Sequence, residues 1–308
     1  MSEWDTLQAI YRTRGAATRA YHKVPPPVQT LINEFSTPPH VIGEFIYMCE
    51  NYNVRAMSAE HYLRRNCYYL PAIMQQMIED IAACGLFAPA GMPATYSITP
   101  KGERFFARAD ELLQPRWSLP PAESETLTQV ITLLRPVVKA TLDGNLPCET
   151  WAVQTRAQYG SKVAPTALPF QQLNELIFDL WAYRDDSHLA AWRVPYPDIS
   201  PQAWEALSVL WEGKANTPAA TAEALKDHGF SADDYAVALQ TLLARGWVTE
   251  DEAIYTLTAD GKKRRDTAET LTNEYFYTPF SVLTAAERAE LNTAMEQVLA
   301  ALQAIAAQ

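Results

Sequence analysis

Two stretches decide the fold: ATYSITPKGER, from Ala94 to Arg104, and AIYTLTADGKK, from Ala253 to Lys263. Each places a tyrosine, a hydroxyl residue and an aliphatic residue before a threonine, and a glycine and a charged pair follow. The alternation around Tyr96 and Tyr255 is typical of a short strand, and the segment from the threonine to the glycine predicts a turn. Because this pattern occurs twice in the sequence, the chain is predicted to contain a duplicated module.

Three helices are predicted in front of each stretch. Apolar residues recur there every three or four positions, serines stand where N-caps are expected, and glycines stand where helices end. The predicted helices are, in the first copy, Pro39–Asn51, one that starts at Ser58 and one from Pro71 to Gly85, and in the second copy Pro201–Trp211, Thr221–His228 and one from Ser231 to Gly246.

Three helices followed by a strand pair describe a winged helix-turn-helix. We therefore expect a mainly α protein in which a helical middle segment joins two winged helix-turn-helix domains. The expected divisions are an N-terminal arm (1–35), a first winged-helix domain (36–113), the helical middle segment (114–197) and a second winged-helix domain that ends in an amphipathic helix (198–308).

The two ends of the chain carry their own signals. The proline run VPPP at Val24–Pro27 stops a helix, so the basic residues in front of it are expected in an arm. Thr284 and Glu287 form a predicted capping box at the start of the terminal helix. That helix packs on its own domain or pairs two chains into a homodimer.

Composition restricts the function. The 308 residues include 48% hydrophobic and 20% charged residues, as in a globular protein, and no apolar run or signal peptide points to a membrane. The four cysteines and five histidines form no metal-binding spacing, and no catalytic motif is present. We expect a cytoplasmic, non-enzymatic protein without a cofactor. The net charge of −11 counts against a simple nucleic-acid binder, although local cations can still bind DNA.

A family resemblance appears in the second copy. The stretch GWVTEDEAIYTLTADGKK, preceded by FSADDYAVALQTLLAR, resembles the third helix and wing of MarR-type winged-helix proteins. The resemblance implies a transcriptional regulator whose third helix enters the major groove of double-stranded DNA while the wing touches the backbone. It also implies a small aromatic or lipophilic effector. The wing tips depart from the family, because APAGMP is neutral and TEDE is acidic where relatives carry an Asp and an Arg.

The first copy carries the candidate DNA-reading residues. Arginines bind phosphates, and Gln or Asn side chains read adenine edges. The alternative is a solvated helix–turn surface. The candidates before and on the third helix are Arg64, Arg65, Asn66, Tyr68, Tyr69, Gln75 and Gln76.

The second copy is less suited to reading a groove. Asp233 and Asp234 at the start of its third helix favour the helix dipole but repel phosphates. A basic run follows the wing, and it either touches the DNA backbone or forms a solvated face. The run consists of Lys262, Lys263, Arg264 and Arg265.

Aromatic residues suggest an apolar effector pocket between the middle segment and the second copy. The alternative is that they belong to the core. The candidates are Trp151, Trp181, Trp192, Trp204, Tyr275 and Tyr277. The nearby Asp185, Asp186 and His188 do not share a helix face, which disfavours acid–base or metal chemistry, and the favoured interpretation is a capping segment for a helix toward Trp192.

Two functions remain. The leading hypothesis is a MarR-like transcriptional regulator that binds DNA through the first copy and responds to a small apolar effector. The alternative is a winged-helix module that binds a protein and not DNA.

Overall fold

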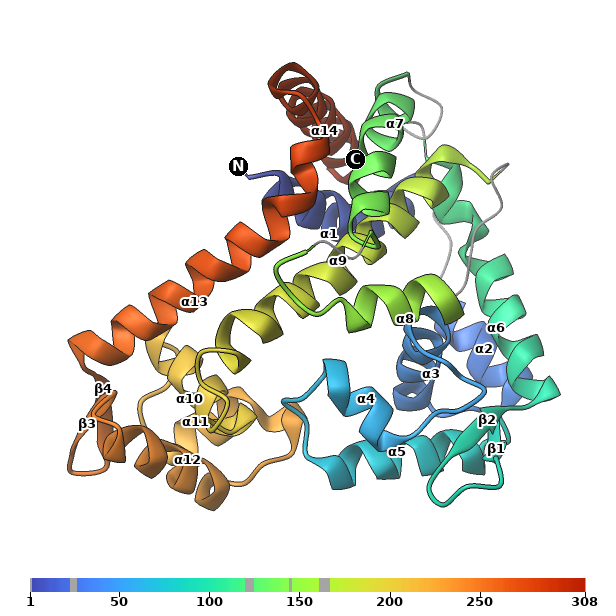
Figure 1. Cartoon of the computed structure of the whole chain (residues 1–308). Coiled ribbons are helices and arrows are strands. Elements are labelled where there is room, and N and C mark those ends of the chain that lie inside the picture. The colour runs from blue at the N-terminus through green and yellow to red at the C-terminus, as the bar shows by residue number, and fades with distance from the viewer. Residues whose placement is uncertain (1, 23–26, 120–124, 144–145, 161–166, 308) are drawn as a thin grey trace.

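The computed structural model describes residues 2–22, 27–119, 125–143, 146–160 and 167–307, so Val24–Pro26 of the proline run lie outside the described residues. The chain is mainly helical, as predicted (Figure 1). Its elements are α1 (Glu3–His22), α2 (Pro27–Phe35), α3 (Pro39–Asn51), α4 (Ala59–Arg65), α5 (Pro71–Ala83), β1 (Phe87–Pro89), β2 (Tyr96–Ile98), α6 (Pro100–Leu113), η1 (Gln114–Ser118), α7 (Glu125–Ala140), α8 (Trp151–Tyr159), α9 (Pro169–Arg193), α10 (Pro201–Trp211), α11 (Pro218–Ala224), η3 (Lys226–His228), α12 (Ala232–Ala244), β3 (Val248–Asp251), β4 (Ile254–Leu257), α13 (Ala259–Tyr277), η4 (Thr278–Val282) and α14 (Ala285–Ala306).

The expected order of elements occurs twice. The first unit consists of α3, α4, α5, the β1–β2 hairpin and α6, and the second consists of α10, α11, α12, the β3–β4 hairpin and α13. Both hairpins are antiparallel, with Phe87 opposite Ile98 and Val248 opposite Leu257. The two quoted stretches therefore occupy the same place, the second strand and the helix start, in both units.

The repeated threonine closes each unit through its side chain. Thr99 Oγ1 accepts a hydrogen bond from the Gly102 N–H (3.1 Å) and donates to the Gly85 carbonyl (2.6 Å). In the second unit Thr258 accepts from the Gly261 N–H (3.0 Å) and donates to the carbonyl of Gly246 (2.8 Å). Each threonine thus caps the helix after the hairpin and ties it to the end of the third helix.

The repeated glycine is required by a close approach. A Cβ on Gly102 would lie 2.4 Å from the Leu86 carbonyl oxygen, and one on Gly261 would lie 2.0 Å from the Trp247 carbonyl oxygen. Both distances are far below van der Waals contact, so only a residue without a side chain lets the helix start against the strand.

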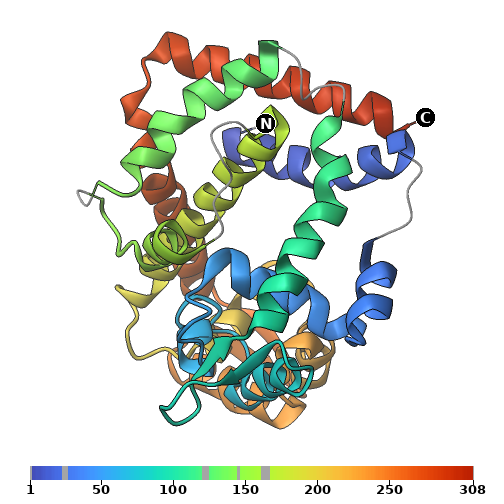
Figure 2. The ribbon, with the colours of Figure 1, turned by 90° about the vertical axis from the view of Figure 1, so that its right-hand side faces the viewer.

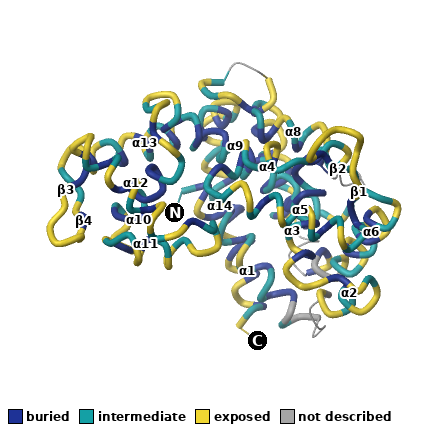
Figure 3. The backbone as a smooth tube through the Cα atoms, turned by 90° about the horizontal axis from the view of Figure 1, so that it is seen from below, coloured by how far each residue is buried: buried dark blue, intermediate teal, exposed yellow. Residues whose placement is uncertain are grey.

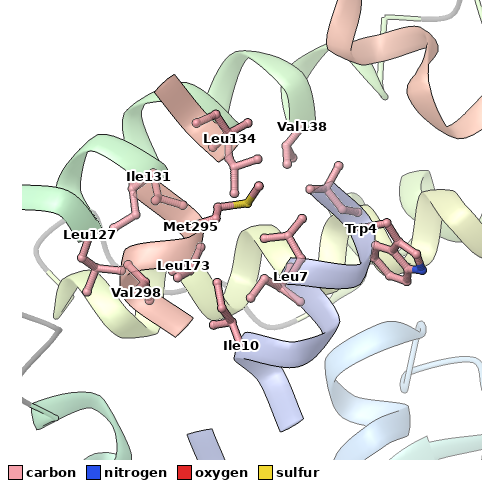
Figure 4. Packing of buried hydrophobic residues seen from close by; sticks show 14 of the residues in the cluster. Trp4, Leu7, Ile10, Leu127, Ile131, Leu134, Val138, Leu173, Met295 and Val298 are labelled. Carbon is pink, nitrogen blue, oxygen red and sulfur yellow. The ribbon is translucent and has the colours of Figure 1, made fainter. Parts of the chain in front are cut away.

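The N-terminal residues differ from the predicted arm. Residues 3–22 form α1, which packs along α14, so the first and last helices of the chain lie side by side (Figure 4). Trp4, Leu7 and Ile10 are buried in a core shared by α1, α7, α9 and α14. The apolar residues of this helix repeat at helical spacing, and their burial in that core stabilises the helix.

The terminal helix uses its apolar face within its own chain. The predicted capping box of Thr284 and Glu287 is confirmed. Leu291, Met295 and Leu302 are buried in the same core as α1. The face that the sequence offered for pairing two chains is therefore already covered.

The helix α9 connects the parts of the molecule. Phe170 and Leu180, in its first half, lie in the core with α1 and α14, whereas Leu189 and Trp192 lie in the core of the second unit. The prediction of a capping segment was wrong, since residues 185–188 lie inside this helix. At the other side of the molecule, α6 rises from the first hairpin toward the helical bundle (Figure 2).

The two units also contact each other directly. The N–H of Leu70, just before α5, donates to the His228 carbonyl, just before α12, at 2.8 Å. The Tyr69 and His228 rings lie 4.6 Å apart. Gly229 approaches Ile73 so closely that a Cβ would overlap the isoleucine side chain. The turns that precede the two third helices are thereby packed against one another.

Candidate nucleic-acid interface

The third helices and the hairpins of both units line one face of the molecule. In Figure 1 this face is the lower edge, where β3–β4, α12, α5 and β1–β2 follow one another, and Figure 3 shows the same elements from below. We call the exposed residues of these four elements the lower face.

Of the predicted base readers on α5, Gln76 is exposed on the lower face and Gln75 is half-buried, and both are held by acids of their own helix. Gln75 donates to Glu79 (2.7 Å) and Gln76 donates to Asp80 (2.9 Å). These bonds occupy amide donors and leave the side-chain carbonyls as acceptors. The exposed part of α5 is therefore polar and negatively charged.

The lower face of the second unit is also acidic. Asp233 and Asp234 are exposed at the start of α12. Asp234 completes a capping box with Ser231, whose hydrogen bonds hold the pKa of that carboxyl below its usual range. Val237 follows on the same helix with 69% of its surface exposed. The fixed negative charge of the two carboxylates repels phosphates, whereas Val237 adds an exposed apolar surface beside them.

Arg65 is not on the surface, which corrects the prediction that it contacts DNA. Only 4% of its side chain is exposed. Its Nε donates to Asp185 Oδ2 of α9 (2.7 Å), and Nη1 donates to Asn51 Oδ1 (3.0 Å). The guanidinium joins the end of α4 to the middle of α9, because a buried cation needs an opposite charge and hydrogen-bond acceptors.

The other candidates before α5 are divided between surface and interior. Arg64 is exposed, pairs with Glu149 and lies over the Trp151 ring. The Asn66 amide donates to the Tyr52 hydroxyl (2.6 Å) inside the first unit. Tyr69 packs against His228 of the second unit, and the Tyr68 hydroxyl lies 3.0 Å from His188 Nε2 of α9. Of these four residues, only Arg64 is exposed.

The basic run after the second hairpin is largely paired within α13. Lys262 bonds to Asp266 (2.7 Å), and Arg264 bonds to Asp260 (3.0 Å). Arg265 is buried, where its guanidinium bonds to Ser208 and Glu269 and lies over Trp211. Lys263 is exposed.

The sequence interpretation missed three further cations, Arg55, Arg104 and Lys214, which together with the predicted Lys263 form two matching pairs. Arg55 and Lys214 are exposed at 74% and 64% in the connections after the first helix of each unit, where they form surface ion pairs with Glu103 (3.0 Å) and Glu212 (2.6 Å). Arg104 and Lys263 are exposed at matching positions, each two residues after the repeated glycine of its stretch. Aligning the two copies from their hairpins, where Met57 and Asn216 both bond to the repeated tyrosine, would have revealed both pairs.

Five of the six predicted effector-binding aromatics, all except Tyr275, pack in or against the cores. Trp192 stacks on Trp204 at 5.4 Å in the core of the second unit. Trp181 packs against Trp4, Tyr275 supplies only a carbonyl to the Tyr183 hydroxyl, and Tyr277 packs under Arg288. Trp192 and Trp204 belong to one core, and Trp181 and Tyr277 pack against another, so these aromatics do not gather around one site. Trp151 alone among the six lines the cleft described below.

The polar cluster on α9 points in several directions. Asp186 accepts hydrogen bonds from the Ala152 and Val153 N–H groups (2.8 and 3.0 Å) and so caps α8, while burial raises its pKa to about 7. Burial lowers the pKa of His188 to about 4. Together with Asp185, these residues connect α9 to three different neighbours. Nowhere in the described residues do three or more His, Cys, Asp or Glu side chains gather as metal ligands would.

Comparison with known proteins finds a family match for the part of the chain that contains the second unit. The model of a family described as helix-turn-helix matches residues 162–307, a little under half of the chain. No curated protein and no solved structure matches. Within the described residues, no helix is long and apolar enough to span a membrane. The match covers α9 to α14, and it identifies a helix-turn-helix protein, a class that indicates, at a coarse level, a DNA-binding regulator.

Proposed function

We propose that the protein is a cytoplasmic transcriptional regulator of MarR-like type in which both units are winged helix-turn-helix domains. The observation that carries the proposal is the lower face, where two third helices and two hairpins lie in a row (Figure 1). The hydrogen bond from Leu70 to His228 fixes the two third helices relative to each other. One chain thereby places two units side by side on one face, with α5 of the first unit as the groove-reading helix, because the carboxylates at the start of α12 repel phosphates.

The cations beside the hairpins supply the phosphate contacts in this proposal. Arg55 and Arg104 flank the first hairpin, and Lys214 and Lys263 flank the second. Gln76 on α5 retains an amide carbonyl that accepts from base amines. The acids of α5 and α12 oppose non-specific binding, so we expect stable binding only to a cognate sequence.

Removing one cation at each hairpin is expected to weaken DNA binding. The variant Arg104→Ala with Lys263→Ala should lower the affinity for DNA about tenfold or more. It should also reduce the slope of log K against log salt by about 2, because two fewer phosphate contacts displace counterions from the DNA on binding. The measurement is fluorescence anisotropy with duplexes from the region upstream of the gene, at two salt concentrations.

The matched control is Arg12→Ala with Lys139→Ala, which removes the same charge from exposed positions on α1 and α7, away from the lower face. Its affinity should equal that of the wild type within experimental error. Equal losses in both variants would show a general charge effect. No binding to any duplex at low salt would eliminate the proposal.

A second function is favoured by one specific observation. Asp233, Asp234 and the exposed Val237 form an acidic and apolar surface on α12, which suits a basic protein segment better than a phosphate backbone. In that case the chain binds a protein and not DNA. The test is co-purification with wild type and with Asp233→Lys plus Val237→Ser. A basic protein retained only by wild type, together with no DNA binding, would support this alternative.

A further inference from the structure

A cleft separates α8 from the first unit. Its volume is about 310 Å³, at the small end of the range for ligand sites. One wall belongs to the connection after α3 and to α4, with Tyr52, Asn53 and His61. The opposite wall belongs to α8, which lies far from these residues in the sequence.

The wall on α8 is a single helical face. Trp151, Gln154, Thr155, Gln158 and Tyr159 are spaced by three, one, three and one positions, which places all five on the same side of the helix. The other side is occupied: Ala152, Val153 and Arg156 are buried. The face toward the cleft therefore contains an aromatic residue at each end and amide or hydroxyl groups between them.

The cleft contains no formal side-chain charge other than what His61 can carry. None of its eight lining residues is Asp, Glu, Lys or Arg, in a chain in which 20% of the residues are charged. Solvated helix faces usually carry charges, so this composition is more suited to a ligand than to water. An anionic ligand would find no lining Arg or Lys, and the Arg64 guanidinium over the Trp151 ring (4.8 Å) is already paired with Glu149. A purely apolar ligand would cover amides of Asn53, Gln154 and Gln158 without satisfying their hydrogen bonds.

Some of the polar groups are held in place by neighbours. Gln154 donates to the Thr150 hydroxyl (2.7 Å), and Asn53 Oδ1 accepts from the Arg55 N–H (3.1 Å). These contacts orient the side chains and leave the Gln154 carbonyl and the Asn53 amino group for a ligand. The cleft is thus a set of oriented donors and acceptors beside aromatic rings.

We propose that this cleft binds an uncharged planar heterocycle with ring donors and acceptors, of the size and chemistry of a nucleoside. The heterocycle stacks on an aromatic ring of α8, with Tyr159 as the more exposed of the two, and its edge bonds to the Gln158 amide. The Thr155 hydroxyl and the Asn53 amide are available to a sugar. Binding at this site does not depend on whether the lower face binds DNA.

The test is isothermal titration calorimetry of the full chain with adenosine, guanosine, cytidine and uridine, with adenosine monophosphate as a charged counterpart. At least one nucleoside is expected to bind with a Kd of about 100 µM, the affinity expected for a ligand of this size. Gln158→Ala and Tyr159→Ala should each weaken it about fivefold or more, since each removes one of the proposed contacts. Both residues are exposed, so the variants should fold.

The matched control is Gln303→Ala, an exposed glutamine on α14, which should bind the nucleoside as wild type does. Weaker binding of the monophosphate than of adenosine would support the uncharged character of the site. No heat with any of the four nucleosides up to about 5 mM would overturn the proposal. Binding that is unchanged in both cleft variants would also overturn it. Loss of DNA binding in the cation variant described above affects neither result.

Discussion

Replacing Asp185 with alanine is expected to lower the free energy of unfolding by about 3–5 kcal/mol, because it leaves the Arg65 guanidinium buried without its counter-charge. Arg65→Met is expected to cost less, about 1–3 kcal/mol. The difference follows from exposure: 4% of the Arg65 side chain is exposed, against 33% of the Asp185 side chain. After the loss of its partner the carboxylate, whose pKa burial already raises, can take up a proton at its partly exposed position, whereas the guanidinium stays charged.

Urea unfolding of the two single variants and the double variant Arg65→Met with Asp185→Ala measures this asymmetry. The double variant should resemble Arg65→Met and be more stable than Asp185→Ala, since no buried charge remains. An Arg65 variant less stable than the Asp185 variant would contradict the burial seen in the structure.

The Arg65–Asp185 ion pair also affects how the DNA binding of Arg65 variants is interpreted. A loss of DNA binding in an Arg65 variant reports the connection between α4 and α9, not a lost phosphate contact. Arg64 differs from Arg65, because it is exposed and its ion pair with Glu149 lies at the surface. Surface pairs of this kind contribute less than about 1 kcal/mol, so Arg64→Ala should leave stability almost unchanged.

The repeated units could be predicted because their signals are local. A threonine that caps a helix and a glycine at a close approach act over a few residues, so the sequence shows both directly. The position of α1 depends on long-range packing. Its apolar residues Trp4, Leu7 and Ile10 were visible at helical spacing, but nothing local indicates that residues almost 300 positions later cover them.

The candidate site was predicted less well for the same reason. Residue type alone does not show that Arg65 turns inward, because its partner Asp185 lies on a distant helix. The ion pairs of Lys262 with Asp266 and of Arg264 with Asp260 could be predicted from the sequence, since the partners stand four positions apart on one helix. The cleft was not predicted because its walls come from separate parts of the chain.

Replacing the repeated glycine with alanine is expected to be among the most destabilising small changes in either unit. Gly102→Ala and Gly261→Ala should each lower the free energy of unfolding by about 3 kcal/mol or more, the upper end for overpacking. In both cases the added methyl group meets a backbone carbonyl oxygen, at 2.4 Å and 2.0 Å. A side chain could rotate away, but a carbonyl moves only if the end of the third helix and the hairpin move with it.

The control is Gly43→Ala, in the exposed middle of α3, where a Cβ would meet no atom within 4 Å. This change should raise the free energy of unfolding by about 0.5–1 kcal/mol, because alanine loses less backbone entropy in a helix. The same Gly→Ala change is thus expected to lower the free energy of unfolding at Gly102 and Gly261 and to raise it at Gly43. This difference in sign distinguishes the effect of the close approach from that of helix propensity. A stable Gly261→Ala variant with an unchanged hairpin would show that α13 does not start against Trp247. In that case the two stretches would share a sequence pattern without sharing its physical cause.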